Sequence, residues 1–253
     1  MSCDKSYNWT LSELPQEMGT VFTCFAGGGG SSMGYQLAGY DVIGCNEIDP
    51  RMMQVYQRNL APRLTYLEPI QTLVRRDDLP PELYNLDILL DAQYMGVPQR
   101  RARVFFLAFR EDLAPIKQPL NVYSNSRVVT AKEISDYLGR EIKSTIARWL
   151  WEHRAVGDRT QADANVRLRN KRSSYNHAYV YADKVCPTLL SKSDCLMHFS
   201  QPRYLSQAEV CKISSFPLDY DFCGQSPHYI CGMSVPPLMM YHVACAIRQY
   251  IHL

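Results

Sequence analysis

The chain has 253 residues, of which 46% are hydrophobic and 21% are charged, and its formal net charge is +2. This length can bury one sizeable core with a small appended lobe, and the composition is typical of a globular protein rather than a disordered one. No apolar run reaches the roughly 18 to 20 residues that a membrane span needs. Residues 1–10 are polar and unlike a secretory signal. We therefore expect neither a membrane protein nor a secreted one.

The nine cysteines are scattered without a repeating spacing, and Cys24, Cys45 and Cys245 lie inside apolar runs. Buried, reduced thiols of a cytoplasmic protein give this pattern, whereas a disulfide framework does not. No Cys-x-x-Cys pair and no His/Cys cluster is present, so we expect no metal site.

A glycine-rich turn follows the first apolar run of the chain. Residues 20–25 are β-prone, and residues 27–30 are four consecutive glycines. Ser31 and Ser32 are candidate N-caps of the helical pattern that follows, and Gly39 is its candidate C-cap. The expected local structure is a strand, a tight turn and a helix.

The next strand and helix follow directly. Residues 41–45 form a second buried run that ends at Glu47, and Asp49 and Pro50 suit the cap and the first turn of another helix. Because apolar strands alternate with helices, we expect a parallel sheet covered on both faces. Further strands are expected at 86–90 and 103–109, and further helices at 131–138, 143–151, 205–216 and Pro237–Ile251. Residues 152–178 are polar, basic and without helical periodicity, and are expected to be irregular.

Arginine and lysine gather in two places, although the net charge is too small to indicate a nucleic-acid ligand by itself. From charge alone, a solvated basic face is the simplest interpretation. One group comprises Arg100, Arg101 and Arg103, and the other comprises Arg148, Arg154, Arg159, Arg167, Arg169 and Lys171.

The glycine turn and Glu47 together indicate a nucleoside-cofactor site. Glycines let backbone amides approach a ligand closely, and an acid that ends the second strand can accept hydrogen bonds from ribose hydroxyls. The nicotinamide motif Gly-x-Gly-x-x-Gly is absent from every frame through residues 27–34. A nicotinamide-dependent oxidoreductase is therefore the less favoured alternative.

The turn itself, Phe25-Ala26-Gly27-Gly28-Gly29-Gly30, resembles the Phe-x-Gly-x-Gly-Gly turn of the cytosine-5 DNA methyltransferases. The resemblance implies S-adenosylmethionine as cofactor and S-adenosylhomocysteine as product. Pro69 stands where the family usually has an aspartate that contacts the adenine. The cofactor-binding residues so implied are Phe25, Ala26, Gly27, Gly29, Gly30, Glu47, Ile48, Ile70, Ser234 and Val235.

Residues 91–104 contain Tyr94-Met95-Gly96-Val97-Pro98-Gln99-Arg100-Arg101-Ala102-Arg103, which resembles the family motif Tyr-Gly-Val-Pro-Gln-x-Arg-x-Arg. The resemblance places Arg101 and Arg103 at the pocket for the target cytosine, and Gln99 beside that pocket and the DNA. Such donors suit the polar edge of a flipped base.

Two C-terminal segments agree with the same family. The elements Cys186-Pro187-Thr188-Leu189, Arg203-Tyr204-Leu205-Ser206 and Ser215-Phe216-Pro217 resemble those that organise its recognition region. Gly232-Met233-Ser234-Val235-Pro236-Pro237 resembles its Gly-Asn-x-Val-Pro-Pro element, with Met233 in place of asparagine. The residues so implied to contact DNA are Gln99, Arg148, Arg154, Arg167, Arg169, Lys171, Arg172 and Arg203.

The catalytic motifs of the family are absent. It uses the cysteine of a Pro-Cys pair as nucleophile and a glutamate of a Glu-Asn-Val run, and this sequence has neither pair. Residues 86–90 resemble the strand before the Pro-Cys loop, yet Asp91 already leads to the arginine motif. Losing a strand from the middle of a sheet leaves buried backbone groups unpaired, at about 1 to 3 kcal/mol each. We therefore expect the functional protein to carry a further segment between Leu90 and Asp91.

The sequence thus predicts an α/β, Rossmann-like methyltransferase domain (residues 18–119), a small irregular DNA-recognition lobe (120–200) and a segment that returns to the catalytic domain (201–253). The expected function is methyl transfer to C5 of a flipped cytosine in duplex DNA. If the chain is complete, a catalytically inactive binder of cofactor or DNA is the alternative, and an RNA methyltransferase is a variant. We expect a cytoplasmic monomer of bacterial or phage type, with a cognate restriction endonuclease as a candidate partner.

Overall fold

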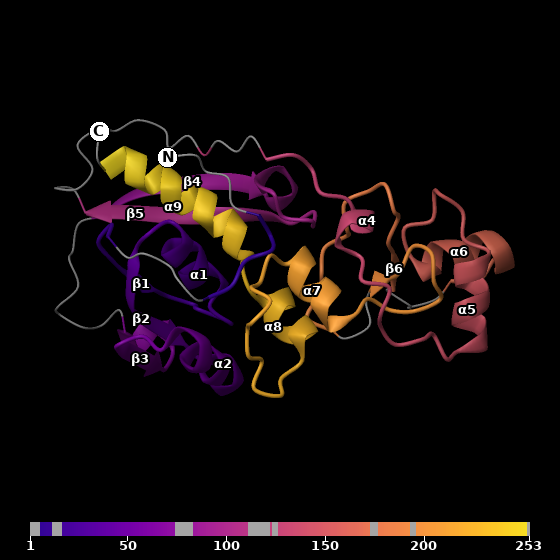
Figure 1. The fold of residues 1–253 in the computed structure, drawn as a ribbon, viewed down its shortest axis with the longest axis horizontal. Helices are drawn as coiled ribbons and strands as arrows, with labels where there is room; N and C mark the ends of the chain where they lie inside the picture. The colour runs from indigo at the N-terminus through magenta and orange to yellow at the C-terminus, as the bar shows by residue number, and fades with distance from the viewer. Residues whose placement is uncertain are drawn as a thin grey trace.

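A parallel three-stranded sheet forms one end of the protein. The computed structural model describes residues 6–11, 17–73, 83–110, 122, 126–172, 177–192 and 196–251, with backbone alone at 73, 83–88 and 106–110. The sheet order is β1 (Thr20–Thr23), β2 (Asp41–Glu47) and β3 (Leu64–Leu67), and both pairings are parallel. Helices α1 (Gly30–Leu37) and α2 (Pro50–Leu60) connect the strands (Figure 1). The carboxyl ends of all three strands therefore meet at one edge.

The helix caps of this sheet follow the sequence only in part. Asp49 caps α2 by accepting a hydrogen bond from the Arg51 amide, with Pro50 in the first turn, as predicted. The N-cap of α1 is Gly29 rather than Ser31 or Ser32. Ser32 is buried instead, and its hydroxyl contacts Thr23 Oγ1 at 2.9 Å and Tyr56 OH at 2.6 Å.

The prediction of one parallel sheet is wrong for the later strands. β4 (Leu83–Asp91) and β5 (Ala102–Arg110) pair antiparallel, with Leu90 opposite Arg103, and form a sheet of their own. The 3-10 helix η1 (Ala92–Met95) lies in the connection between them. β4 runs without a break through Leu90 and Asp91, so no loop marks the predicted junction, and the missing segment stays a prediction.

One edge of the parallel sheet lacks a partner among the described residues. β1 pairs with β2 along one edge, and no described strand pairs with its other edge. In a doubly wound sheet that edge receives the next strand of the core. The free edge of β1 is therefore consistent with an additional strand in the functional protein.

A second group of elements forms the other end of the protein. It contains α4 (Ala131–Ile134), α5 (Thr145–Glu152), α6 (Gln161–Arg169), β6 (Ala178–Tyr179) and β7 (Leu196–Met197), and we call it the lobe (Figure 1). Its small core includes Leu150, Trp151, Ala164 and Tyr179. The domain boundaries at 119 and 200 stay predictions.

Two helical predictions for the lobe are wrong. The helix expected over 131–138 ends at Ile134, because Ser135 is extended and Tyr137 has φ 60°. Part of the region expected to be irregular forms α6, which Thr160 and Asp163 start with a capping box. The buried face of α6 is Gln161, Ala164 and Asn165, which explains its weak apolar periodicity.

The C-terminal helices connect the two ends. α7 (Gln207–Ile213) and α8 (Pro227–Met233) lie between the sheet and the lobe, and α9 (Pro237–Ile251) lies along β4 and β5 (Figure 1). The bounds of α9 match the prediction, whereas α8 was not predicted. The stretch Pro227–Ile251 has the length and apolarity of a membrane span, but 83% of its 18-residue apolar window is buried inside the protein, as expected of a core helix.

A buried acid joins α7 to the lobe. Glu209 is fully buried and accepts hydrogen bonds from both terminal nitrogens of Arg203, at 2.8 and 2.9 Å. Its carboxylate also accepts from the Ser135 hydroxyl and the Asp136 amide. The end of α4 and the start of α7 are therefore joined through one side chain.

Replacing Glu209 with alanine is expected to destabilise the protein by about 3 to 5 kcal/mol, because Arg203 then stays charged and buried without a partner. Urea unfolding measures this loss. The control is Glu152→Ala, which removes an exposed Arg148 pair and should cost less than about 1 kcal/mol. Equal losses in the two variants would contradict the assigned role.

His198 makes folding stability depend on pH. Its Nδ1 accepts from the Ser200 and Gln201 amides, so Nε2 carries the proton and donates to Ser135 Oγ. Burial lowers the pKa of His198 from 6.5 to about 4. The unfolded chain binds this proton more tightly, so stability is complete above pH 6.5 and falls as the pH drops toward 4.

The expected loss between pH 6.5 and 4 is about 3 kcal/mol more for the wild type than for His198→Gln. Denaturant unfolding at a series of pH values measures it. Parallel pH profiles of the two proteins would show that His198 does not titrate in this window.

Candidate cofactor and nucleic-acid site

The glycine turn is shaped by close packing as well as by backbone conformation. Gly27 has φ 53° and Gly29 has φ 85°, which glycine adopts without strain. A Cβ on Gly28 would overlap the Ile230 side chain, and one on Gly30 would overlap the backbone carbonyl of Val235. The turn therefore tolerates no side chain at these positions.

The Glu47 carboxylate is fixed at the end of β2. Oε2 accepts a hydrogen bond from the Gly27 amide at 2.7 Å, and Oε1 accepts from the amides of Ile48 and Asp49 at 2.8 and 2.9 Å. The carboxylate thus lies beside the glycine turn, as the sequence predicts for a ribose-binding acid. Its position is set by backbone donors rather than by another charged side chain.

Two apolar side chains beside the turn are exposed. Phe25 is 73% exposed and has φ 53°, a conformation that is uncommon for a bulky residue. Ile48, next to Glu47, is 63% exposed. Ile70 begins α3 (Ile70–Leu73) directly after β3, at the same edge of the sheet. This edge therefore offers apolar surface and a fixed carboxylate, which suits a nucleoside.

A C-terminal segment closes the other side of the turn. The Ser234 hydroxyl accepts from the Gly28 amide at 3.1 Å and donates to Ile230 O at 2.7 Å. The Tyr220 hydroxyl donates to Gly28 O. The glycine turn and a segment about 200 positions later in the sequence therefore form one site, which includes the predicted residues Ser234 and Val235.

Asp49 also connects the sheet to α8. Its carboxylate accepts hydrogen bonds from the Arg51 guanidinium and from the Tyr229 hydroxyl at 2.6 Å. The hydrogen bond with Arg51, together with the one from Tyr229, holds the pKa of Asp49 well below its usual value. The start of α2 is thereby tied to the same C-terminal segment that closes the turn.

Arg101 lies in the interior rather than at an open pocket. It is 3% exposed, and its guanidinium donates to the carbonyls of Leu189, Gly232 and Ser234. Burial, followed by repulsion from Arg103, lowers the pKa of Arg101 to about 10, so it stays charged at pH 7. Arg101 thus positions the segment that packs on the glycine turn, and its predicted role at the base pocket stays a prediction.

Gln99 and Arg203 are also buried, so their side chains are not accessible to DNA. Gln99 is 1% exposed, and its amide donates to Ile213 O and accepts from the Leu189 amide. Arg203 is held by Glu209 as described above. Both predictions are corrected because their polar groups are already engaged in the interior.

Several basic residues of the lobe are engaged by other groups, and some of these are exposed as well. Arg154 donates to Trp151 O and Phe199 O, and Arg167 pairs with the buried Asp158. Arg148 pairs with Glu152 on the surface. Arg103 is half-buried in β5, and its guanidinium donates a hydrogen bond to Ala102 O. The predicted DNA-contacting residues that stay exposed are Arg148, Arg167, Arg169, Lys171 and Arg172.

Three described cysteines, Cys24, Cys45 and Cys186, lack the environment of a nucleophile, whereas a hydrogen bond with Cys231 lowers the pKa of the buried Cys211. Burial raises the pKa of Cys45 to about 11 and that of Cys186 to about 12, and it also raises the pKa of the exposed Cys24. A thiolate requires a lowered pKa or a neighbouring base. No cluster of three potential metal ligands occurs among the described residues either.

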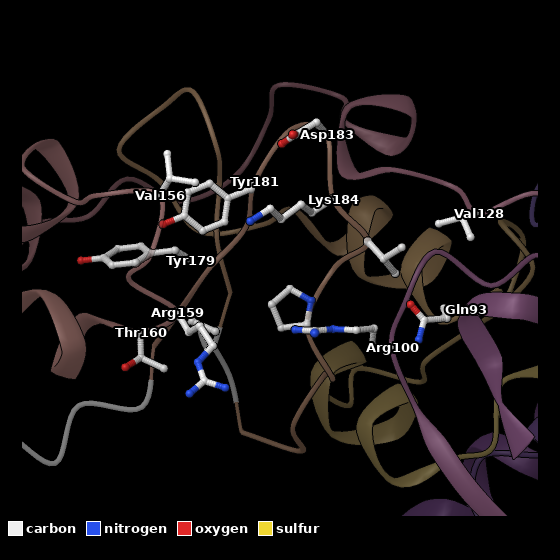
Figure 2. Close-up of a pocket in the computed structure, with 13 residues that line it drawn as sticks. Gln93, Arg100, Val128, Val156, Arg159, Thr160, Tyr179, Tyr181, Asp183 and Lys184 are labelled. Carbon is white, nitrogen blue, oxygen red and sulfur yellow. The ribbon is translucent and has the colours of Figure 1, made fainter. Parts of the chain in front are cut away.

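A hollow of about 520 Å³ lies between the arginine motif and the lobe, with Arg100, Arg159 and Lys184 among the residues that line it (Figure 2). Arg159 lies in the basic run between Arg148 and Arg172 and Arg100 lies in the arginine motif, both of which the sequence singles out, whereas Lys184 was not predicted.

The chain matches one known protein family. Residues 74–249 match the family described as C-5 cytosine-specific DNA methylase. A search of curated proteins found no match.

Solved structures show the same fold at low identity. An E. coli prophage protein described as a DNA modification methyltransferase has a TM-score of 0.65 and 16% identity, over 94% of this chain and all of that one. DNMT2 of Spodoptera frugiperda has a TM-score of 0.65 and 11% identity, over 91% and 99% of the two chains. The methyltransferase EhMeth of Entamoeba histolytica has a TM-score of 0.64 and 12% identity, over 92% and 98%. The Rossmann-like methyltransferase fold predicted from the sequence is confirmed.

Replacing Gly30 with alanine is expected to separate the glycine turn from the C-terminal segment, because the new Cβ overlaps the carbonyl of Val235. Affinity for S-adenosylhomocysteine should fall at least 10-fold, equal to about 1.4 kcal/mol. Calorimetry measures it, with Gly157→Ala as the control, since nothing lies within 4 Å of a Cβ there. Unchanged affinity in Gly30→Ala would show that the contact is not needed.

Proposed function

Because the chain belongs to the C-5 cytosine-specific DNA methylase family, we propose that it binds S-adenosylmethionine at the glycine turn and serves methyl transfer to C5 of a flipped cytosine in duplex DNA. One observation carries the proposal. The Glu47 carboxylate, the glycine amides and the exposed side chains of Phe25 and Ile48 meet at one sheet edge, which is a suitable seat for an adenosine group.

The residues present fit this cofactor. Close packing of Ile230 and Val235 around Gly28 and Gly30 forms a cradle that a side chain would fill. Glu47 retains the capacity to accept hydrogen bonds from ribose hydroxyls, since carboxylate oxygens accept more than one. When bound, S-adenosylmethionine supplies an activated methyl group. The chain's own residues orient the donor and exclude water on the side that Ser234 covers.

Arg103 is the candidate for contact with the target base. It follows Arg101, whose buried hydrogen bonds fix the motif against Gly232 and Ser234. A guanidinium at this place donates to a base edge or to its phosphate. The Pro-Cys pair whose cysteine adds to C6 of cytosine in this family is absent from the sequence. This chain therefore lacks the group that starts the reaction, although it binds cofactor and DNA.

We propose that activity requires a further segment that brings the cysteine and the glutamate. The free edge of β1 supports this, because a strand placed there would extend the parallel sheet. Without that segment the protein is a catalytically inactive binder. A cytoplasmic location, a monomeric state and a restriction endonuclease partner belong to the same proposal. RNA in place of DNA is the main variant, which competition between the two duplexes distinguishes.

Glu47→Ala is expected to lower affinity for S-adenosylhomocysteine by about 10- to 100-fold, since a hydrogen bond to a charged group contributes about 1.5 to 3 kcal/mol. Calorimetric titration measures it. Glu152→Ala is the control, because Glu152 lies on α5 of the lobe, where it pairs with Arg148. If Glu47→Ala binds S-adenosylhomocysteine as tightly as the wild type, Glu47 does not contact the ribose.

Methyl transfer distinguishes the enzyme from the inactive binder. The 253-residue chain should bind S-adenosylhomocysteine yet transfer no labelled methyl group to duplex DNA. Intact mass of the purified polypeptide shows whether the tested chain has only these residues, at 29.0 kDa. Methyl transfer by a chain of that mass would refute the need for a further segment.

A further inference from the structure

Tyr229, in the first turn of α8, reaches the beginning of α2 from the C-terminal segment. Its hydroxyl donates to Asp49 Oδ2 at 2.6 Å and accepts from the Arg51 guanidinium at 2.8 Å. Because a guanidinium has no acceptor, the hydrogen of the tyrosine must face Asp49. The hydrogen bond to Asp49 raises the pKa of Tyr229, so the hydroxyl remains a donor at pH 7. The Arg51 guanidinium also lies 4.5 Å from the centre of the Tyr229 ring, which holds the ring in place.

Asp49 stands between Tyr229 and the candidate ribose-binding acid. Its Oδ1 accepts from the Arg51 amide at 2.9 Å and caps α2, while its Oδ2 accepts from the Tyr229 hydroxyl. The Asp49 amide in turn donates to Glu47 Oε1 at 2.9 Å. Because both oxygens of the Asp49 side chain are held, the backbone of this residue and the direction of its amide are fixed.

The Glu47 carboxylate is oriented by three backbone amides, those of Gly27, Ile48 and Asp49. Gly27 has no side chain, and the apolar side chain of Ile48 is exposed. Of these three donors, Asp49 is the one whose side chain is hydrogen-bonded to a distant segment. A residue of α8 can therefore act on Glu47 through Asp49.

The far end of α2 has its own attachment to the C-terminal part of the chain. Asn59 Nδ2 donates to Asp221 O at 2.7 Å, and the Asp221 amide donates to Asn59 Oδ1 at 2.8 Å. Arg58 pairs with the Asp221 carboxylate. Because these contacts do not involve Tyr229, α2 stays docked when the tyrosine hydroxyl is removed, and the local effect of the hydroxyl can be measured.

We propose that Tyr229 and Asp49 are positioning residues for Glu47, and that they set how strongly the site prefers a ligand with ribose hydroxyls over one without them. The inference rests on the proposed function, in which Glu47 accepts hydrogen bonds from the ribose. A carboxylate that is already held in one orientation loses less freedom when the hydroxyls bind. Tyr229 has no contact with the ligand in this account, because its hydroxyl is engaged by Asp49 and Arg51.

The test compares the affinity of the full chain for S-adenosylhomocysteine and for its 2′,3′-dideoxy analogue by calorimetry. The wild type should prefer S-adenosylhomocysteine by about 10- to 100-fold, since the hydroxyls bond to a charged group. Tyr229→Phe should lower this preference by about 3- to 10-fold, the size of one hydrogen bond, and leave affinity for the analogue unchanged. The matched control is Tyr181→Phe, which removes a hydroxyl that bonds to Ala155 O and Asp158 O in the lobe and should keep the wild-type preference.

Asp49→Asn tests the same contact from its other side. Asparagine also suits the N-cap of a helix, but it replaces the carboxylate that Tyr229 holds, so the preference should again fall. The double variant should lose no more than the larger of the two single losses, because both substitutions remove one contact. Independent losses that multiply in the double variant would show that Tyr229 does not act through Asp49.

A structural role alone would weaken binding of both ligands equally. Equal weakening in Tyr229→Phe, or an unchanged preference, overturns the inference and leaves the proposed function standing. If the wild type binds the two ligands equally well, Glu47 does not contact the ribose, and the inference fails with that part of the proposed function. If the wild type binds neither ligand, the proposed function itself fails.

Discussion

The close approach of the C-terminal segment to the glycine turn is the constraint on which the candidate site depends. Gly28 and Gly30 leave room for Ile230 and Val235 only because they carry no side chain. Ser234 and Tyr220 then satisfy the amide and the carbonyl of Gly28. A turn that is open on one side to ligand is thus closed on the other by residues about 200 positions away.

The arginine motif is coupled to the same segment. Arg101 donates to the carbonyls of Gly232 and Ser234, so the motif and the glycine turn share one neighbour. Any shift of α8 alters both the cofactor seat and the place of Arg103.

The sequence predicted local features where the cause is local. Asp49 and Pro50 start α2, and the apolar face of α9 marks Pro237–Ile251, because capping and periodicity act over a few residues. The sequence did not predict α6, because the buried face of this helix is mostly polar. It also did not predict that β4 pairs antiparallel with β5 rather than joining the parallel sheet. These two strands follow each other in the chain, yet their own residues do not show whether they pair with each other or with the parallel sheet.

The roles of individual arginines were the least predictable part. A motif shows that arginine is required, but burial decides whether it binds a carbonyl inside or a phosphate outside. Arg101 and Arg203 are internal, whereas Arg100 and Arg159 are exposed and have no carboxylate partner for their guanidinium groups among the described residues, although all four stand in basic or motif segments. That difference depends on tertiary partners such as Glu209, which stands six positions from Arg203 and also binds α4.

Amide hydrogen exchange with and without S-adenosylhomocysteine tests the central claim most directly. The account predicts slower exchange on adding the ligand in three peptides, those that contain residues 25–30, 47–49 and 232–235, because these backbones form or support the seat. Unchanged exchange in all three at saturating ligand, or protection confined to the lobe, would contradict the claim that the glycine turn is the cofactor site.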